Sequence, residues 1–218
     1  MYLAIDGVIG VGKTSLVRLL QPAFGAQTLL EVFEENPFLS DFYSDRARYA
    51  FQTQIFFLLS RYHQQRAAPE LLEQGPLIAD YTFAKDALFA RINLAGDDLT
   101  LYRRLHAALA EKIPHPDLVV YLRAPTAVLM QRIARRARAY ELQMDAGYIA
   151  ELNAAYDEFF AEFGAPDGPH ARQPVLTLDT EHLDFVSNGD DLRRVAEQIQ
   201  AALGVGAYQV ALPLGGSA

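Results

Sequence analysis

Short apolar segments bounded by turn-forming residues recur along the chain, and longer segments with helical spacing of apolar residues separate them. Strands that are buried on both faces of a parallel sheet have this short, continuously apolar character. The pattern predicts five strands, at residues 2–6, 28–33, 76–80, 117–123 and 174–179. Between them it predicts helices near residues 14–22, 47–68, 84–93, 97–112, 125–138, 146–163 and 189–203. This alternation predicts a three-layer α/β fold, in which a central parallel five-stranded sheet has helices on both faces and binds ligands at the carboxyl ends of its strands.

The size, charge and composition of the chain narrow its possible functions. A chain of 218 residues is long enough for one α/β domain and short for two, so we expect residues 1–218 to form a single domain with a C-terminal tail at about 204–218. The formal net charge of −8 argues against a nucleic acid partner. The chain has no cysteine, which excludes disulfides and thiolate metal sites, and it has no apolar stretch long enough to span a membrane. We therefore expect a cytoplasmic protein without a membrane partner.

The segment GVIGVGKTS directly follows the first predicted strand and matches the G-x-x-x-x-G-K-[ST] pattern of phosphate-binding P-loops. Glycine is required there because side chains would keep main-chain N–H groups away from phosphate oxygens. The helix that follows adds the positive end of its dipole. We expect Lys13 to contact the β- and γ-phosphates and Thr14 to bind Mg²⁺. The predicted ATP-binding loop comprises Gly7, Val8, Ile9, Gly10, Val11, Gly12, Lys13, Thr14 and Ser15.

A carboxylate ends the third predicted strand. The segment PLIAD, residues 76–80, is an apolar strand that closes with Asp80. In P-loop proteins a carboxylate in this position provides a second contact to Mg²⁺. We therefore expect Thr14 and Asp80 to bind Mg²⁺, and we count Lys13 and Asp80 among the catalytic residues. The sequence has no guanine-reading N-K-x-D segment, which argues against a GTPase.

A cluster of arginines stands out in this acidic protein. The segment RIARRARAYE contains Arg132, Arg135, Arg136 and Arg138. It is either a solvated helix face or a short lid, at about residues 132–142, whose arginines neutralise the charge of the transferring phosphoryl group. Small-molecule kinases need such a lid because water would otherwise accept the phosphate. If the segment is a lid, we expect Arg132 and Arg136 to be catalytic residues. We also expect Arg136 and Arg138 to bind ATP.

The predicted helix at residues 47–68 is apolar nearly all round, which is typical of a central helix or of a subunit contact. Gln54 and Arg61 lie seven residues apart and therefore on the same face of this helix. Gln54 is either a partly exposed polar residue or part of a binding site. Arg61 requires an acidic partner, because a buried guanidinium without an acceptor is destabilised by several kcal/mol, on the order of the cost of a broken buried ion pair.

These segments together resemble the deoxynucleoside kinase family, and most closely its bacterial deoxyadenosine/deoxyguanosine branch. The resemblance extends from about residue 2 to about residue 200 and rests on five motifs: the P-loop, EVFEENPFLSDFY, the Gln54/Arg61 helix, DYTFAKDALFA and the arginine lid. It implies transfer of the γ-phosphate of ATP, or of another nucleoside triphosphate, to the 5′-hydroxyl of a deoxyribonucleoside in nucleotide salvage. Deoxyadenosine or deoxyguanosine is the implied acceptor.

Three alternatives stay open. One is a kinase of the same family that prefers deoxycytidine. Another is a nucleoside monophosphate kinase of the thymidylate type, although its phosphate acceptor would need basic residues where this chain offers mostly acidic or neutral ones. The last is a non-catalytic, nucleotide-sensing protein that uses helix 47–68 as its partner surface.

The resemblance also implies roles for individual residues. Glu31 is the carboxylate that accepts the proton of the 5′-hydroxyl, whereas Glu34 and Glu35 are nearby alternatives that suit a solvated acidic turn better. Gln54, Arg61 and Asp86 read the base, with Arg61 and Asp86 paired to each other and Phe57 shaping the pocket. Tyr43 and Glu141 hold the 3′-hydroxyl, and the tyrosine ring leaves little room for a 2′-hydroxyl. The implied substrate-binding set is Glu31, Tyr43, Gln54, Arg61, Asp86 and Glu141.

The chain departs from the wider family in several places. Tyr81 stands where animal members have an arginine near the phosphates, Asp80 is one methylene shorter than the corresponding glutamate, and Ala137 replaces a lid glycine. Family members pair helices from two subunits. We therefore expect a homodimer, or a heterodimer with a related subunit, whose interface includes helices 47–68 and 97–112.

Overall fold

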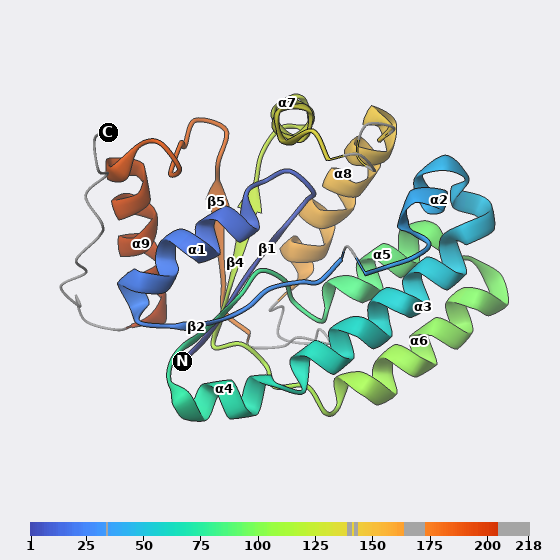
Figure 1. Ribbon diagram of the computed structural model, residues 1–218, viewed down its shortest axis with the longest axis horizontal. Coiled ribbons are helices and arrows are strands. Elements are labelled where there is room, and N and C mark those ends of the chain that lie inside the picture. The colour runs from blue at the N-terminus through green and yellow to red at the C-terminus, as the bar shows by residue number, and fades with distance from the viewer. Residues whose placement is uncertain (34, 139–140, 142–143, 164–172, 205–218) are drawn as a thin grey trace.

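Five parallel strands form the centre of the molecule. The structure is a computed structural model that describes residues 1–33, 35–138, 141, 144–163 and 173–204. Its sheet has the strand order β2-β3-β1-β4-β5, and every neighbouring pair is parallel. The predicted parallel five-stranded sheet is therefore confirmed (Figure 1). The strands are β1 (Tyr2–Gly7), β2 (Gln27–Leu29), β3 (Leu77–Ala79), β4 (Leu118–Arg123) and β5 (Val175–Asp179).

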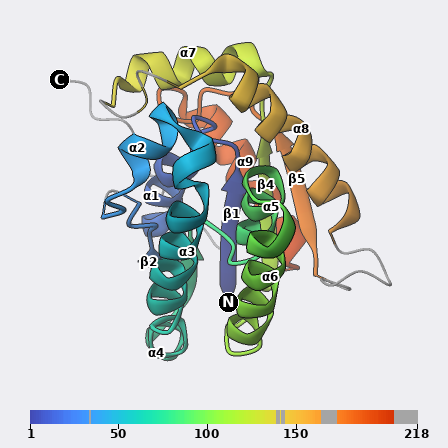
Figure 2. The same cartoon turned by 90° about the vertical axis from the view of Figure 1, so that its right-hand side faces the viewer.

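Helices cover both faces of this sheet. α1 and α9 lie on one side, α3, α5 and α8 lie on the other, and α7 crosses the end at which the strands finish (Figures 1 and 2). This arrangement confirms the three-layer architecture. The helices are α1 (Lys13–Phe24), α2 (Leu39–Ser44), α3 (Arg46–Gln65), α4 (Ala68–Gln74), α5 (Lys85–Asn93), α6 (Gly96–Ala110), α7 (Thr126–Arg136), α8 (Ala146–Glu162) and α9 (Gly189–Leu203). Within the described residues, none of these helices has the length and apolar character that crossing a membrane requires.

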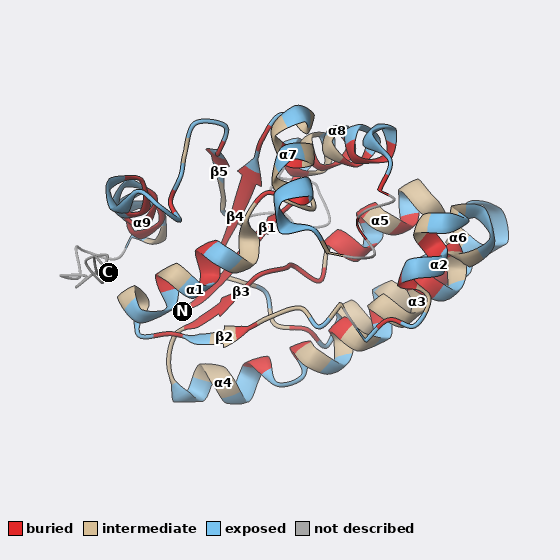
Figure 3. Ribbon diagram, turned by 45° about the horizontal axis from the view of Figure 1, so that its top comes forward, coloured by how far each residue is buried: buried red, intermediate tan, exposed pale blue. Residues whose placement is uncertain are grey.

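β1 carries the P-loop to the middle of the sheet. All six residues of the strand are buried, as is most of the neighbouring sheet (Figure 3). Its register pairs Ala4 with Ala79 of β3 and Gly7 with Leu122 of β4. Because the carboxyl ends of parallel strands meet at one edge, the P-loop and the residue that follows β3 lie close together there.

The predicted helix near residues 47–68 is confirmed as α3 (Arg46–Gln65), although it ends earlier than predicted. α3 ends at Gln65, and the separate helix α4 begins at Ala68. Pro69 lies in the first turn of α4, where a missing backbone N–H is tolerated. In a continuous helix its ring would clash with the carbonyl of Gln65, four residues earlier, so the chain starts a new helix instead.

The second strand is shorter than the predicted segment 28–33. The part of this segment that pairs with β3 ends at Leu29, the last residue of β2. Beyond it, the backbone N–H of Glu31 donates to Asp80 Oδ1 over 2.7 Å, so a side chain replaces the strand ladder. The chain then turns toward α2, a short helix that was not predicted. Glu34 and the predicted tail from residue 205 onward lie outside the described residues, while Glu35 is exposed, as a solvated turn requires.

Candidate active site

Two glycines let the P-loop pack tightly against its neighbours. Gly7 has a φ of +146°, and a Cβ atom there would lie 2.4 Å from the carbonyl oxygen of Leu122. Gly10 has a φ of +88°, and a Cβ atom there would lie 2.7 Å from a side-chain carbon of Ile133 in α7. A larger residue at either position requires a left-handed or otherwise unfavourable backbone and displaces a neighbour. The loop therefore runs directly beneath the helix that carries the arginine cluster.

The Lys13 side chain is hydrogen-bonded to the backbone of this loop. Its ammonium donates to the carbonyl oxygens of Gly7, over 2.7 Å, and of Val8, over 3.1 Å. Burial, and after it the neighbouring Lys85 ammonium, lowers the pKa of Lys13 to about 8. Phosphate oxygens placed against Lys13 would raise that pKa again. Anion binding and protonation of this lysine therefore favour each other.

Thr14 and Asp80 bring two hard oxygen ligands together. Thr14 Oγ1 donates to Asp80 Oδ2 over 2.5 Å, and the other carboxylate oxygen accepts the backbone N–H of Glu31. Hydroxyl and carboxylate oxygens suit Mg²⁺, so this pair fits the predicted ion. No group of three or more His, Cys, Asp or Glu side chains in the described part of the chain could enclose a metal. A metal held here would take most of its ligands from phosphate and water.

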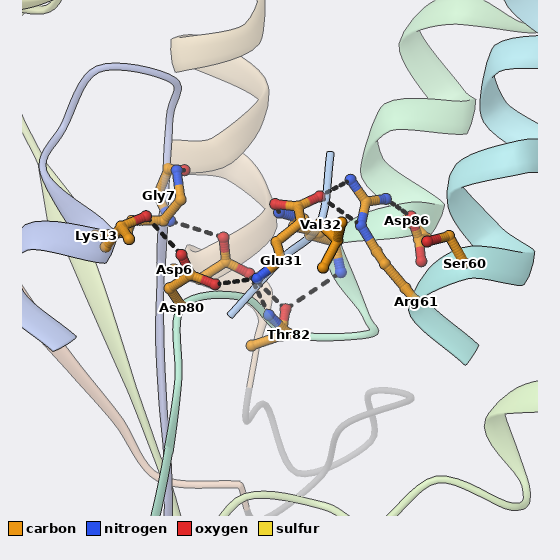
Figure 4. Close-up of polar contacts among 12 residues, drawn as sticks. Asp6, Gly7, Lys13, Glu31, Val32, Ser60, Arg61, Asp80, Thr82 and Asp86 are labelled. Carbon is orange, nitrogen blue, oxygen red and sulfur yellow. Dashed lines mark hydrogen bonds and ion pairs between the residues drawn. The ribbon is translucent and has the colours of Figure 1, made fainter. Parts of the chain in front are cut away.

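A buried charge network surrounds Glu31 (Figure 4). Arg61 donates to Glu31 Oε1 from Nε over 2.8 Å and from Nη2 over 2.5 Å, and its Nη1 pairs with Asp86, as predicted. Lys85 Nζ donates to the other oxygen, Glu31 Oε2, over 2.7 Å. Although burial opposes it, the Arg61 guanidinium and the Lys85 ammonium hold the pKa of Glu31 well below its usual range. Glu31 is therefore an ionised carboxylate whose two oxygens face separate cations.

The Glu31 carboxylate lies on the wall of a cavity of about 110 Å³ that also reaches the P-loop, here called the Glu31 cavity. Asp86 is fully buried behind Arg61. Phe57 lies on the wall, as predicted, and the guanidinium of Arg61 is 4.7 Å from the centre of its ring. The other five predicted substrate-binding residues all line the cavity: Glu31, Tyr43, Gln54, Arg61 and Glu141.

Three buried oxygen atoms near this wall have no hydrogen-bond partner among the described residues. They are Thr53 Oγ1, Gln54 Oε1 and Asp86 Oδ2. Gln54 is only 2% exposed, so its interpretation as a partly exposed residue is wrong. An unpaired buried polar group is destabilised by about 1–3 kcal/mol. The arrangement therefore favours a ligand that brings hydrogen-bond donors to this wall.

A second cavity, here called the α7 cavity, lies on the other side of the P-loop. It is lined by the P-loop, by α7 and by residues 181–186, which connect β5 to α9. Gly10 and Arg136 line both cavities. The P-loop therefore has a cavity on each side. Among the predicted ATP-binding residues, Val8 lines neither cavity because its side chain is buried in the core.

Arg132 is anchored rather than free in the α7 cavity. Its Nη1 donates to Thr180 Oγ1 over 3.0 Å and to the carbonyl oxygen of Val11 over 3.3 Å, and its Nη2 donates to the Thr180 carbonyl oxygen over 2.6 Å. The side chain thus connects α7, the P-loop and the end of β5. Its place in the structure fits a residue that holds the P-loop in position as well as one that contacts phosphate.

Arg136 and Arg138 face the Glu31 cavity. Arg136 Nε donates to Glu141 Oε2 over 3.0 Å, and the Arg138 guanidinium lies 4.5 Å from the centre of the Phe33 ring. α7 ends before Ala137, which has a φ of 50°, a left-handed backbone that glycine adopts more readily. The lid therefore turns at the position where the resemblance expects a glycine. Residues 139–140 and 142 of the predicted lid lie outside the described part of the chain.

Two buried charged residues were not predicted from the sequence. Asp6, at the end of β1, accepts hydrogen bonds from the backbone N–H of Gly7, from the N–H and hydroxyl of Thr82 and from the hydroxyl of Tyr156. A carboxylate inside the apolar strand before a P-loop is a signal that could have identified it. Lys85 is the other, and its partner Glu31 lies 54 residues earlier in the chain.

The comparisons with known proteins cover nearly the whole described region. A family model described as deoxynucleoside kinase matches residues 3–203. The chain belongs to the deoxynucleoside kinase family. A deoxyguanosine kinase of Bacillus subtilis is 33% identical over 201 residues, which are 91% of this chain and 96% of that protein. A deoxyadenosine/deoxycytidine kinase of the same organism is 29% identical over 209 residues, which are 92% of each chain.

A solved structure extends this likeness to three dimensions. Deoxyadenosine kinase from M. mycoides, with the products dCMP and dCDP bound, matches with a TM-score of 0.79 and 26% identity, covering 92% of this chain and all of the other. This deoxynucleoside kinase therefore transfers phosphate from ATP to a nucleoside and forms the monophosphate, as predicted. The alternatives of a monophosphate kinase and of a non-catalytic nucleotide sensor gain no support from these relatives.

Proposed function

We propose that this kinase phosphorylates purine deoxynucleosides, which bind in the Glu31 cavity with the 5′-hydroxyl against Glu31. The observation that carries the proposal is the position of Glu31: its carboxylate lines the cavity while its backbone N–H donates to Asp80 over 2.7 Å. The proposed proton acceptor is thus directly connected to the Thr14–Asp80 pair. A primary alcohol is a poor nucleophile, so a carboxylate within hydrogen-bond reach orients it and takes its proton as the bond to phosphorus forms.

The lowered pKa of Glu31 determines when that proton moves. A carboxylate whose pKa is far below neutral is a weak base, so it does not remove the proton before the hydroxyl reacts. Phosphoryl transfer through a loose transition state requires little prior deprotonation of the nucleophile. In this proposal Glu31 first holds the hydroxyl in line with the γ-phosphate and then accepts the proton late, when the forming P–O bond has made it acidic.

Base recognition is assigned to Gln54, Arg61 and Asp86. Gln54 Oε1, on the cavity wall, lacks a partner among the described residues, so it gains a hydrogen bond from a donor on the base, while Asp86 holds the neighbouring Arg61 in place. Adenine and cytosine carry an exocyclic amino group where thymine has its O4 carbonyl oxygen, and guanine carries its amino group at C2 instead. Thymine has no exocyclic amino group to donate to Gln54 Oε1, which disfavours thymidine. A deoxycytidine preference is the second candidate, because one relative is a deoxyadenosine/deoxycytidine kinase.

The sugar is assigned to Tyr43 and Glu141. Glu141 is 5% exposed and paired with Arg136, so its carboxylate is fixed at the cavity wall. The Tyr43 ring makes an edge-on contact with Phe42 at 5.4 Å between ring centres, which restricts its movement. With both groups on the 3′-hydroxyl, the ring leaves little room for a 2′-hydroxyl. We therefore expect deoxyribose to be preferred over ribose.

ATP is assigned to the P-loop, with its triphosphate on residues 7–15 and its base in the α7 cavity. Lys13 contacts the β- and γ-phosphates, and Arg136, which lines both cavities, reaches the phosphoryl group between them. Arg132 and Arg138 support the same group from either side. Mg²⁺, held by Thr14 and Asp80, supplies charge neutralisation on the phosphates when bound. We place this ATP-dependent reaction in the cytoplasm.

The proposed assembly is a dimer built on α3 and α6. These helices lie side by side on one face of the molecule (Figure 2). Each carries an exposed leucine, Leu59 with 40% and Leu101 with 56% exposure. Burying such side chains stabilises association by roughly 25 cal/mol per Å² of apolar surface. Light scattering of the purified chain should give about twice 24.2 kDa, and a mass near 24.2 kDa would contradict the homodimer.

The proposed reaction is tested by ADP release from ATP with deoxyguanosine or deoxyadenosine as acceptor. The matched control acceptor is 2′,5′-dideoxyadenosine, which keeps the base and the 3′-hydroxyl but lacks the 5′-hydroxyl. We expect turnover with the parent nucleosides and none above the background ATPase rate with the control. Turnover of the control, or no turnover of any deoxynucleoside, would contradict the proposal.

A further inference from the structure

Lys85 is a buried lysine at the centre of the active site that the roles assigned above leave unused. It lies at the start of α5 and is 3% exposed. Its ammonium donates to Glu31 Oε2 over 2.7 Å and lies 5.5 Å from the centre of the Tyr81 ring. Its backbone N–H donates to Thr82 Oγ1, which in turn donates to Asp6, so the base of the side chain is held firmly in place.

The two cations on Glu31 are held differently. Arg61 pairs with both Glu31 and Asp86, so a carboxylate still holds it if one partner is lost. Among the described residues, Glu31 is the only carboxylate within ion-pair distance of Lys85. A hydroxyl group that binds Glu31 Oε2 therefore competes with Lys85 alone. Lys85 is the cation that such a ligand releases.

Lys85 lines the same cavity as the phosphate-binding lysine, Lys13. The positive charge of Lys85 contributes to the lowered pKa of Lys13. Two like charges brought together in a largely buried site repel each other unless an anion lies between them. An anionic group bound on the Glu31 side of the P-loop would relieve this repulsion once Lys85 has left Glu31.

We propose that Lys85 binds the phosphoryl group during its transfer, turning from Glu31 to the phosphoryl oxygens when the nucleoside hydroxyl takes its place on the carboxylate. The inference rests on the proposed function. The 5′-oxygen forms a bond to the γ-phosphorus, the bond between that phosphorus and the β,γ-bridging oxygen breaks to leave ADP, and the hydroxyl proton passes to Glu31. Because Lys85 has moved, Glu31 then faces one cation instead of two and accepts the proton more readily. One lysine thus stabilises the transferring charge and strengthens the base in the same step.

The test compares three lysine variants, since the sequence contains only Lys13, Lys85 and Lys112. Lys85→Met removes the charge at similar length, Lys85→Arg keeps the charge, and Lys112→Met is the control at an exposed position. We expect kcat to fall roughly 10²- to 10³-fold in Lys85→Met, as for loss of one donor to a transition state, with KM for the nucleoside changed less than about threefold. Lys85→Arg should recover at least part of kcat, and Lys112→Met should match the wild type. Thermal unfolding identifies a variant that fails to fold, and in that case Lys85→Gln replaces Lys85→Met.

A binding measurement separates this role from one that merely positions Glu31. Calorimetry with a deoxynucleoside and with its 5′-monophosphate should show that Lys85→Met loses at least about tenfold in affinity for the monophosphate and little for the nucleoside, as loss of one charged contact implies. Equal losses for both ligands, or a kcat above a third of the wild-type value, would overturn the proposal. If the wild type phosphorylates no deoxynucleoside, the proposed function fails, while the binding comparison still tests Lys85 by itself.

Discussion

The two cavities on either side of the P-loop are built in opposite ways. In the Glu31 cavity, Arg61 and Lys85 are at most 4% exposed, and both pair with the carboxylate of Glu31. In the α7 cavity, the P-loop backbone and the arginines of α7 form much of the wall, and Arg135 is exposed. Backbone N–H groups bind phosphate oxygens whatever they are attached to, whereas buried side chains with unpaired acceptors favour one pattern of donors. We therefore expect the Glu31 cavity to select among nucleosides. The P-loop and the α7 cavity should bind phosphate groups with little selectivity.

The largest effect is expected where the two cavities meet. Lys13→Ala removes the charge on the β- and γ-phosphates, and Asp80→Asn weakens the proposed Mg²⁺ site and its bond to Thr14. Charge neutralisation is the main catalytic contribution in phosphoryl transfer, so each variant should lose at least about 10³-fold in kcat/KM. ADP release measures the loss, with Lys112→Ala as a surface control. Turnover within tenfold of the wild type in either folded variant would contradict the shared site.

The next largest loss of activity is expected from a substitution in the Glu31 cavity. Glu31→Gln keeps the size of the side chain but cannot accept a proton, so kcat should fall by roughly 10²–10⁴-fold with a smaller change in KM. The affinity for ATP, measured by calorimetry, should change less than kcat, because the P-loop contacts of Lys13 and the Thr14–Asp80 pair are kept. A loss confined to KM would make Glu31 a binding residue only.

A third prediction concerns base selectivity. Arg61→Met alone should be strongly destabilising, by about 3–5 kcal/mol, because it leaves buried Asp86 without its cation. Adding Asp86→Ala removes that uncompensated charge and should recover part of the stability, as followed by urea unfolding. In the double variant the ratio of kcat/KM for purine deoxynucleosides to that for thymidine should fall roughly 10- to 100-fold. An unchanged ratio would remove both residues from base recognition.

The smallest effect lies on the ATP side and depends on pH. The pKa of Lys13 is about 8 in the free protein, and bound phosphate raises it, so ATP binding should take up protons near pH 8. Affinity is then full below this pKa and falls as the pH rises through it, because free Lys13 loses the proton that the complex retains. Calorimetry in two buffers of different ionisation enthalpy measures the uptake. Proton release, or no exchange at pH 8, would show that Lys13 does not respond to the phosphates as described.

The elements that depend on local sequence were predicted well. The P-loop, the carboxylate after β3 and the five strands follow from glycine spacing and short apolar runs, which act within a few residues. The break between α3 and α4 was also within reach, because Pro69 cannot continue a helix from Gln65. The early end of β2 was not, since it depends on a hydrogen bond from Glu31 to Asp80, which lies 49 residues away.

The charge pattern of the site required the structure. The sequence predicts that Arg61 needs an acidic partner, and the resemblance supplies Asp86, but neither reveals that Arg61 and Lys85 share Glu31. For Asp6 the sequence offers a signal, a carboxylate inside an apolar strand, but not its partners, which come from three separate parts of the chain. The charge state of a buried side chain depends on neighbours that lie far away in the sequence. The spacing of apolar residues does not reveal these neighbours.

The central claim, a kinase that is selective on its nucleoside side, is tested most directly by kcat/KM for deoxyguanosine, deoxyadenosine, deoxycytidine and thymidine at saturating ATP. The account predicts that at least one purine deoxynucleoside is the best substrate and exceeds thymidine by at least about tenfold, as unpaired buried acceptors require. Thymidine as the best substrate, or four values within a factor of two, would contradict it.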